Sequence, residues 1–288
     1  MKPSTQIDYQ ARIDSALRWM SARLDAEVAP ADVAQAVALS PYHFHRIFRG
    51  VTGESVMQCL RRLRLEAAAR QLWQREANVI DVALAAGYNS HEGFTRAFKD
   101  HFGEAPDTWR QQHREFVRSQ SSNVVLPVPV VEVRDVPTVP FISMAYRGSF
   151  AEVGQVWERF IGLAASLGLF TGSEQLIGRY PDDPDITPAG KIRFDVGLRG
   201  SPDPSRLPLH PALHAEVLPA GRWAVALHRG SYATLHETYL SLVGGWIARN
   251  GYVLDDRPCL EWYLNSPATT AEADLLTEVW APLLFEAT

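Results

Sequence analysis

The chain has 288 residues, 46% of them hydrophobic, and a net charge of −5, which is enough material for two hydrophobic cores. No apolar run approaches the roughly 20 residues that cross a bilayer, and the N-terminus lacks the apolar segment of a signal peptide. The two cysteines lie far apart without a CxxC pair, which excludes a disulfide framework and a cysteine zinc site. We therefore expect a cytoplasmic, multidomain globular protein with no membrane association, metal or cofactor.

Charge is distributed unevenly along the chain. Residues 1–120 hold 16 Lys and Arg against 14 Asp and Glu, a net charge of +2, whereas residues 121–288 hold 12 against 19, a net charge of −7. Only the first part suits a phosphate backbone, and only if its arginines gather on one face.

Helical periodicity dominates the first 120 residues. Residues 7–24 predict an amphipathic helix, and residues 31–37 and 41–51 predict a short helix, a tight turn and a second helix. Residues 54–75 predict a longer helix whose apolar face holds Val56, Leu60, Leu63, Ala67 and Leu72. A positively charged face is expected on its other side, formed by Arg61, Arg62, Arg64 and Arg70.

The helix-turn-helix pattern occurs a second time beyond this long helix. Phe44, Arg46, Phe48 and Gly53 correspond to Phe94, Arg96, Phe98 and Gly103, each 50 residues later. Such a repeat predicts two helix-turn-helix units joined by the long helix, so that one chain reaches two successive major-groove segments.

The segments LSPYHFHRIFRGVTGESVMQCLRRLRLEAAARQL and IDVALAAGYNSHEGFTRAFKDHFGEAPDTWR resemble the two halves of an AraC/XylS-type DNA-binding domain, over about residues 7–115. The resemblance implies that the second helix of each unit enters the major groove. Ala38 stands where the family usually has a turn glycine.

By position in the family motif, the first reading helix offers Tyr42, His45 and Arg46, and the second offers His91, Glu92, Gly93, Thr95 and Arg96. Arg46 and Arg96 can reach phosphate or the guanine edge, the commonest specific contact of arginine. Lys99 is expected at phosphate, while His91 and Glu92 either contact bases or cap their helix.

Composition changes near residue 118, where a polar and then Pro/Val-rich stretch predicts an extended linker. The expected domains are residues 1–117 (all-α), a linker over 118–137, and residues 138–288 (α+β). A second internal repeat, at an offset of 82 to 83 residues, relates YRGSF at Tyr146 to HRGSY at His228. It predicts two βαββ units about a pseudo-two-fold axis. The expected strands are 139–146, 176–180 and 192–198, then 223–228, 259–263 and 275–280, with helices over 151–167 and 234–250.

A groove between two such units would suit a small molecule, and aromatic residues, Trp157, Tyr180 and Trp262 among them, are abundant there. Glu261 breaks the repeat, because Gly178 occupies its place in the first copy. A carboxylate among aromatic rings can hold a cation through charge and cation–π contact. The candidate effector-binding residues are Glu261, Glu278, Tyr146, Trp223, Phe194, Trp246, Tyr263 and Trp280.

This second half resembles the GyrI-like effector-binding domain, through LHRGSYATLHETYLSLVGGWIARNGY, the DRPCLEWYLNSP block and TEVWAPL. The resemblance implies that Glu261 and surrounding aromatics bind lipophilic cations. Its relatives also include hydrolases of small strained compounds and gyrase-binding proteins, so two alternatives stay open. In the first, Glu261 or Glu278 acts as general base or nucleophile; in the second, the domain binds gyrase.

The preferred hypothesis is a non-enzymatic, one-component transcription regulator, an activator by family tendency, that binds double-stranded DNA and a small-molecule effector. RNA polymerase is a further candidate partner, and the chain is expected to be a monomer or a weak dimer.

Overall fold

A computed structural model of the chain describes residues 3–74, 77–123, 130–170, 174–200, 210–247 and 249–284. They divide into two compact units, Met1–Glu115 and Phe116–Thr288. Among the described residues, no helix is both long and apolar enough to span a bilayer.

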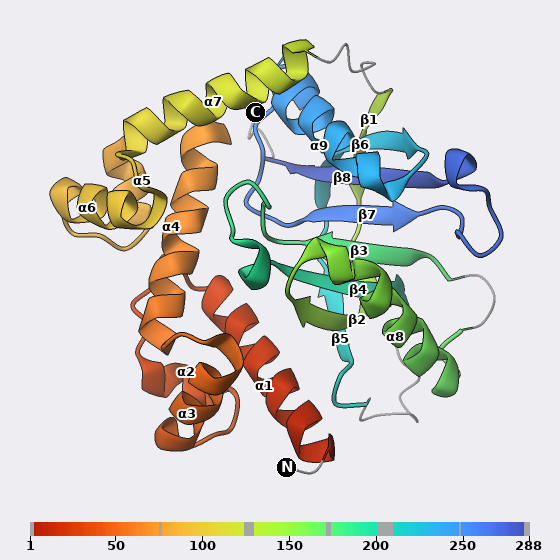
Figure 1. The fold of residues 1–288 in the computed structure, drawn as a ribbon, viewed down its shortest axis with the longest axis horizontal. Coiled ribbons are helices and arrows are strands. Elements are labelled where there is room, and N and C mark those ends of the chain that lie inside the picture. Colours follow the sequence, from red (N-terminus) through yellow and green to blue (C-terminus); the bar gives the residue numbers. More distant parts are fainter. Residues whose placement is uncertain are drawn as a thin grey trace. The chain divides into compact units, whose positions relative to one another are not determined.

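The first unit is helical throughout (Figure 1). Its helices are α1 (Pro3–Ser21), α2 (Pro30–Ala36), α3 (Pro41–Thr52), α4 (Val56–Gln74), α5 (Val79–Ala85), α6 (His91–Phe102) and the beginning of α7 (Pro106–Asn123). The pairs α2–α3 and α5–α6 are the two expected helix-turn-helix units, one packed toward each end of α4. The all-α architecture with two repeated units is therefore confirmed.

Repeat-related phenylalanines anchor each unit against α4. Phe44, Phe48, Phe94 and Phe98 are at most 1% exposed, because they recur at the i, i+4 spacing that places them on one helix face. That leaves the polar residues of α3 and α6 on the outer face of each helix.

Helix α4 differs from the expectation of one apolar and one positive face. Cys59, Leu65 and Ala68 are buried in addition to most of the predicted stripe, so nearly its whole circumference is covered. Packing on several sides explains why a helix with weak amphipathic character is stable here.

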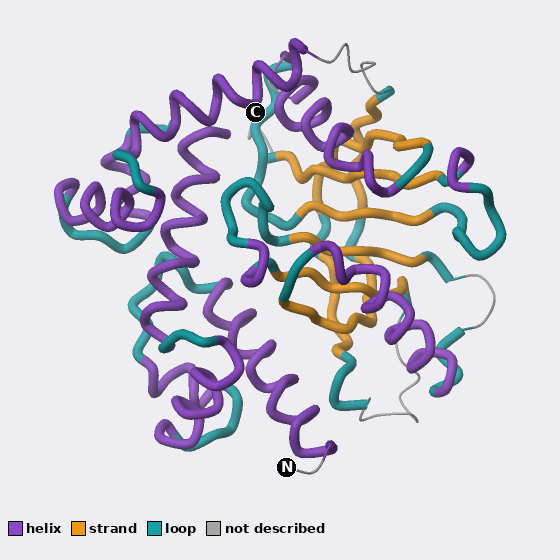
Figure 2. Tube along the Cα trace, in the orientation of Figure 1, coloured by secondary structure: helices purple, strands orange, loops and turns teal. Residues whose placement is uncertain are grey.

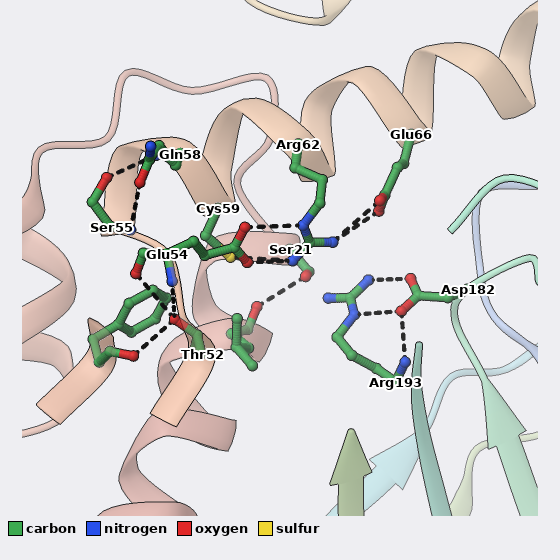
Figure 3. Close-up of polar contacts among 12 residues, drawn as sticks. Ser21, Thr52, Glu54, Ser55, Gln58, Cys59, Arg62, Glu66, Asp182 and Arg193 are labelled. Atoms are coloured by element: carbon green, nitrogen blue, oxygen red, sulfur yellow. Dashed lines mark hydrogen bonds and ion pairs between the residues drawn. The ribbon is translucent and has the colours of Figure 1, made fainter. Parts of the chain in front are cut away.

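The predicted arginine face is correspondingly wrong. Arg62 is only 7% exposed and lies between Glu54, at 2.8 Å, and Glu66, at 3.1 Å, as Figure 3 shows. Arg64 and Arg70 are half-buried, and of the four arginines only Arg61 is largely exposed. Burying Arg62 requires both carboxylates, since an unpaired charge there would cost several kcal/mol.

Among its described residues, the second unit contains an eight-stranded antiparallel sheet and two longer helical segments that pack on it (Figure 2). Its strands are β1 (Val131–Val136), β2 (Val139–Arg147), β3 (Leu176–Tyr180), β4 (Arg193–Arg199), β5 (His214–Leu218), β6 (Gly221–Arg229), β7 (Cys259–Tyr263) and β8 (Leu276–Leu283). The helical segments are η1–α8 (Phe150–Glu152, Val153–Ser166) and η4–α9–η5 (Tyr232–Thr234, Leu235–Tyr239, Leu240–Ile247), and the last part of the second is a π-helix. Short 3₁₀ turns, η2 (Ala189–Lys191) and η6 (Glu272–Asp274), precede β4 and β8.

The two βαββ repeats are present, and the α+β class is confirmed, but each repeat carries one more strand than expected. Strand β1 occupies part of the expected linker, α7 extends through Asn123 into its other end, and residues 124–129 lie outside the described residues. Strand β5 was not predicted. In the order β1-β6-β8-β7-β3-β4-β2-β5, each added strand pairs with the other repeat, β1 with β6 and β5 with β2. The repeats thus exchange their first strands, and β3 and β7 meet at the centre.

The two faces of this sheet have different cores. Helix α8 packs with Ile142, Phe194 and Val196 on one half of the first face, and η5 packs with Ala224 and Val279 on the other half. The opposite face buries Phe141, Ile177 and a tryptophan cluster, with the edge strands curled toward it. Because side chains alternate along a strand, every residue of the sheet is assigned to one face by its register.

Candidate DNA interface and small-molecule site

The outer face of α3 carries the residues expected to read DNA. Tyr42 is 75% exposed, His45 and Arg46 are exposed, and the Arg46 guanidinium lies 5.9 Å from the centre of the Tyr42 ring. His43 instead turns toward α1, where its Nε2 lies 2.9 Å from the Tyr9 hydroxyl. Tyr42, His45 and Arg46 are therefore all accessible to a partner, while His43 is already engaged.

On the outer face of α6, all the candidates except Thr95 are exposed: His91, Glu92, Gly93, Arg96 and Lys99. The N-cap of α6 is Ser90, whose hydroxyl oxygen accepts a hydrogen bond from the Gly93 amide at 3.1 Å. Thus neither His91 nor Glu92 is the N-cap, and both side chains remain available for contacts outside the helix.

Thr95 is placed differently from the other α6 candidates. Its Oγ1 is buried and has no hydrogen-bond partner among the described residues. Arg96 is the exposed neighbour one residue along. Of the two, Arg96 is the residue that can present a charged group to a duplex without rearrangement.

Glu261 is the centre of the second unit's polar cluster. It is 5% exposed, and its oxygens accept hydrogen bonds from the hydroxyls of Tyr239, at 3.1 Å, and Tyr263, at 2.5 Å. The Tyr180 hydroxyl lies 2.9 Å from that of Tyr263. We refer to Glu261, Tyr180, Tyr239 and Tyr263 as the tyrosine–glutamate cluster.

Repeat symmetry explains how this cluster forms. Tyr180 and Tyr263 are repeat-related residues at the ends of the paired strands β3 and β7, so their hydroxyls meet near the pseudo-two-fold axis. Gly178 lies directly opposite Glu261 in the β3–β7 register. A Cβ atom at Gly178 would lie 2.6 Å from the Tyr180 ring, so the glycine makes the space into which Tyr180 folds.

Further aromatic rings surround the cluster on the helix-covered face. The Trp157 ring of α8 meets the Tyr263 ring edge-on at 5.1 Å, and the Tyr232 ring meets it at 5.6 Å. On the other side, Tyr180 contacts Phe150 at 5.7 Å and Phe194 at 6.2 Å. Both repeats therefore contribute rings around one buried carboxylate.

Burial raises the pKa of the Glu261 carboxyl, although hydrogen bonds from Tyr263, Tyr180 and Tyr239 oppose the shift by stabilising the ionised form. Burial and the neighbouring Glu261 charge raise the pKa of all three tyrosine hydroxyls well above the ordinary value. The tyrosines consequently stay protonated and act as hydrogen-bond donors to the carboxylate.

The structure brings together only some of the expected effector residues. Glu261 and Tyr263 belong to the cluster, Phe194 contacts Tyr180, and Tyr146 contacts Phe194 at 5.2 Å. Trp246 is a residue of η5 and packs against the core beneath that segment, where it stacks on Tyr252 at 5.4 Å.

The remaining three lie on the opposite face of the sheet. Glu278 pairs with Arg134 at 2.9 Å and accepts a hydrogen bond from the Trp280 indole at 3.0 Å. Trp223 packs against Trp280 in the same core, with the Arg257 guanidinium over its ring. The cause is the register of β7 with β8, which places Val279, and not Glu278, beside Glu261.

Two residues around Glu261, Tyr239 and Tyr232, were absent from the expected groove, whereas Trp157 and Tyr180 were among its expected aromatic residues. A signal for Tyr239 was available, because it occupies the repeat position equivalent to Trp157, as Tyr263 occupies the one equivalent to Tyr180. Repeat-related aromatic residues near an axis converge on the same site.

Comparison with known proteins agrees with both units. Residues 129–284 match the model of the GyrI-like small molecule binding domain, and residues 33–112 match a helix-turn-helix domain model. The HTH-type transcriptional activator AarP of Providencia stuartii is 31% identical over 98 residues, which are 34% of this chain and 73% of AarP. The uncharacterized HTH-type transcriptional regulator YbfP of Bacillus subtilis is 30% identical over 115 residues, 40% of this chain.

That second match spans only 39% of the length of YbfP. A crystal structure of an AraC-type transcriptional regulator from Chromobacterium violaceum is 26% identical, with a TM-score of 0.35, over 36% of this chain and 92% of that chain. Residues 129–284 are more than half of the sequence, and the helix-turn-helix match covers both repeated units. The chain belongs to the AraC-type helix-turn-helix transcriptional regulators that carry a GyrI-like small molecule binding domain.

Proposed function

We propose that this regulator senses a lipophilic, singly charged aromatic cation at Glu261, and that binding changes how the helix-turn-helix units engage promoter DNA. RNA polymerase is the second macromolecule on which such a change would act, with activation as the expected sign.

The observation that carries the proposal is the electrostatic isolation of Glu261. Three other buried carboxylates are neutralised by arginine: Glu66 by Arg62, Asp182 by Arg193 and Asp195 by Arg179. No ion pair joins Glu261 to a cationic side chain in the described part of the chain; only tyrosine hydroxyls contact its oxygens. Burying a charge without a counter-ion costs free energy. A ligand cation would supply at Glu261 the counter-ion that arginine side chains supply at the other three carboxylates.

The surroundings favour a particular class of cation. Both carboxylate oxygens already accept hydrogen bonds from tyrosine hydroxyls, and rings of Trp157, Tyr232 and Phe150 lie around the cluster. A delocalised or alkylated cation, attracted by charge and by ring faces, suits this site better than a ligand that needs several free acceptors.

The same hydrogen bonds support binding over hydrolysis. A general base needs a free lone pair directed at the proton that it removes, whereas the Glu261 oxygens face tyrosine hydroxyls. Glu278, the other catalytic candidate, is neutralised by Arg134 on the opposite face.

The test is calorimetric titration of the full chain with tetraphenylphosphonium and, separately, with neutral triphenylphosphine oxide. Glu261→Gln should lower cation affinity about tenfold or more while affecting the neutral compound little, because it removes a buried charge at nearly constant shape. Glu278→Gln is the matched control, since it removes a carboxylate on the opposite face. Equal losses for both compounds, or equal effects of both variants, would contradict charge recognition at Glu261.

A further inference from the structure

The two helix-turn-helix units both pack on α4, and Arg64 of that helix contacts the loop that leads into the first unit and the turn of the second. Its Nε donates a hydrogen bond to the Leu24 carbonyl at 2.8 Å, and its Nη2 donates to the Ala26 carbonyl at 2.5 Å. Both carbonyls belong to the loop that leads from α1 into the first unit. One side of the guanidinium is thus fixed to the first half of the DNA-binding domain.

The same guanidinium meets the turn of the second unit. A Cβ atom at Gly87 would lie 3.1 Å from both Cζ and Nη1 of Arg64, tighter than ordinary contact. Gly87 also has a positive φ of 78°, which glycine adopts without strain. Glycine at this turn therefore permits both the backbone conformation and the close approach of Arg64.

Arg12 in the first unit provides the comparison. Its Nη1 donates to the Val37 and Ala38 carbonyls, at 2.7 Å and 3.3 Å, in the turn between α2 and α3. Arg12 lies in α1, which packs on the first unit, and it stabilises the α2–α3 turn of that same unit. Arg64, by contrast, touches the second turn while its hydrogen bonds go to the loop before the first unit.

We propose that Arg64 is a positioning residue that fixes the orientation of α6 relative to α3 and thereby sets the half-site spacing that the protein accepts. Once one unit has bound its half-site, the effective concentration of the other unit at the second half-site is high only if the geometry of the two units matches the DNA. Adjacent major-groove segments lie about one helical turn apart, so a rotation between the units removes the second contact. Replacing Arg64 should weaken binding to a duplex that carries both half-sites more than binding to a duplex that carries only one.

The experiment uses the full chain and duplexes selected from a random-sequence pool by the wild-type protein. Affinity is measured for the selected duplex, for duplexes with one half-site scrambled, and for duplexes with one base pair inserted or removed between half-sites. The variants are Arg64→Ala and Arg64→Lys, because lysine keeps the charge but lacks the second planar N–H arm. Arg61→Ala is the control: it removes a charge from the same helix, and the α6 contact it breaks is a loose ion pair with Asp100, 3.7 Å long and more than half exposed on both sides, which contributes little.

We expect both Arg64 variants to lower the ratio of full-site to half-site affinity by about tenfold, and to reduce the penalty for a one-base-pair insertion. Arg61→Ala should leave that ratio and that penalty unchanged. Equal losses on full and half sites in the Arg64 variants would indicate a phosphate contact or general destabilisation and would overturn the proposal, as would no change. Far-ultraviolet circular dichroism checks folding, and Arg64→Lys decides the outcome if Arg64→Ala does not fold.

Discussion

Glu261 shows how one residue can make ligand binding sensitive to pH. Burial raises its pKa, so the carboxylate takes up a proton at a pH where exposed carboxylates are still ionised. Tetraphenylphosphonium affinity of the wild type should therefore fall as pH decreases through this raised pKa, because the protonated carboxyl no longer attracts the cation. Titrations across weakly acidic pH test this, and Glu261→Gln should show no such dependence. A pH-independent wild type would contradict the assignment.

The same residue also lowers stability at neutral pH. Because folding raises its pKa above the ordinary value of 4.5, the folded state binds the proton more tightly than the unfolded state. The stability from this group is fully present below the unfolded pKa and is lost as pH rises through the folded pKa. We expect Glu261→Gln to be more stable than wild type at pH 7 to 8, by about 1 kcal/mol, and no more stable at pH 4. Urea unfolding at both pH values measures the difference.

Ala38 stores backbone strain in the first turn. Its φ is 54°, the sole positive value at a non-glycine position among the described residues, while Gly87 holds the equivalent place in the second unit. The left-handed conformation costs a residue with a Cβ about 1–2 kcal/mol. Glycine would remove this cost, but its greater conformational freedom in the unfolded chain would cancel part of the gain. Ala38→Gly should stabilise the chain by about 0.5–1 kcal/mol in urea unfolding. Ala36→Gly, in the adjoining helix, should destabilise it by a similar amount.

At the level of elements, the junction of β3 and β7 decides the shape of the tyrosine–glutamate cluster. A methyl group at residue 178 would lie 2.6 Å from the Tyr180 ring, so the ring would have to move and its hydroxyl would leave Tyr263. Gly178→Ala should therefore displace Tyr180 and lower cation affinity about tenfold with only a small loss of stability. Gly162→Ala, where an added Cβ meets nothing within 4 Å, should leave binding unchanged. Unchanged binding in Gly178→Ala would remove Tyr180 from the site.

Helix α4 is the other element whose role the structure changes. Periodicity predicted its position within about two residues, but most of its arginines do not face solvent: Arg62 pairs with two glutamates and Arg64 binds backbone carbonyls. A helix that is buried on several sides holds its neighbours in fixed register. Its contribution to DNA binding therefore lies in orientation, not in an exposed positive face.

At the scale of the whole molecule, effector sensing requires the two sites to be thermodynamically linked. If tetraphenylphosphonium changes operator affinity by some factor, operator DNA must change tetraphenylphosphonium affinity by the same factor. We expect a factor of about 5 to 150, measured by calorimetry with and without DNA and by DNA titration with and without the cation. Glu261→Gln should abolish both effects together. A regulator whose DNA affinity does not respond to saturating cation would contradict the proposed function.

Prediction from sequence worked best where the pattern was local. The strands β3 and β7 have the predicted bounds, because each is a short, largely apolar run flanked by turn residues. Strand β1 was missed because its Pro/Val-rich approach has the composition of a linker, and β5 because it lies in a stretch without a clear alternating pattern. Glu261 was found because it interrupts a repeat, whereas Tyr239 belongs to a helical segment whose contact with β7 no local pattern reveals.

The sequence by itself determined the two repeats, the types of their elements and the family, since each depends on residue order and spacing. Only the tertiary structure decided which charges are exposed and which candidates share a site. Glu261 and Glu278 illustrate the reason. A shift of one residue in the register of β7 with β8 would place Glu278, and not Val279, beside Glu261 on the same face of the sheet. Arg62 and Arg64 illustrate it again, because burial depends on what packs around a helix and not on its own periodicity.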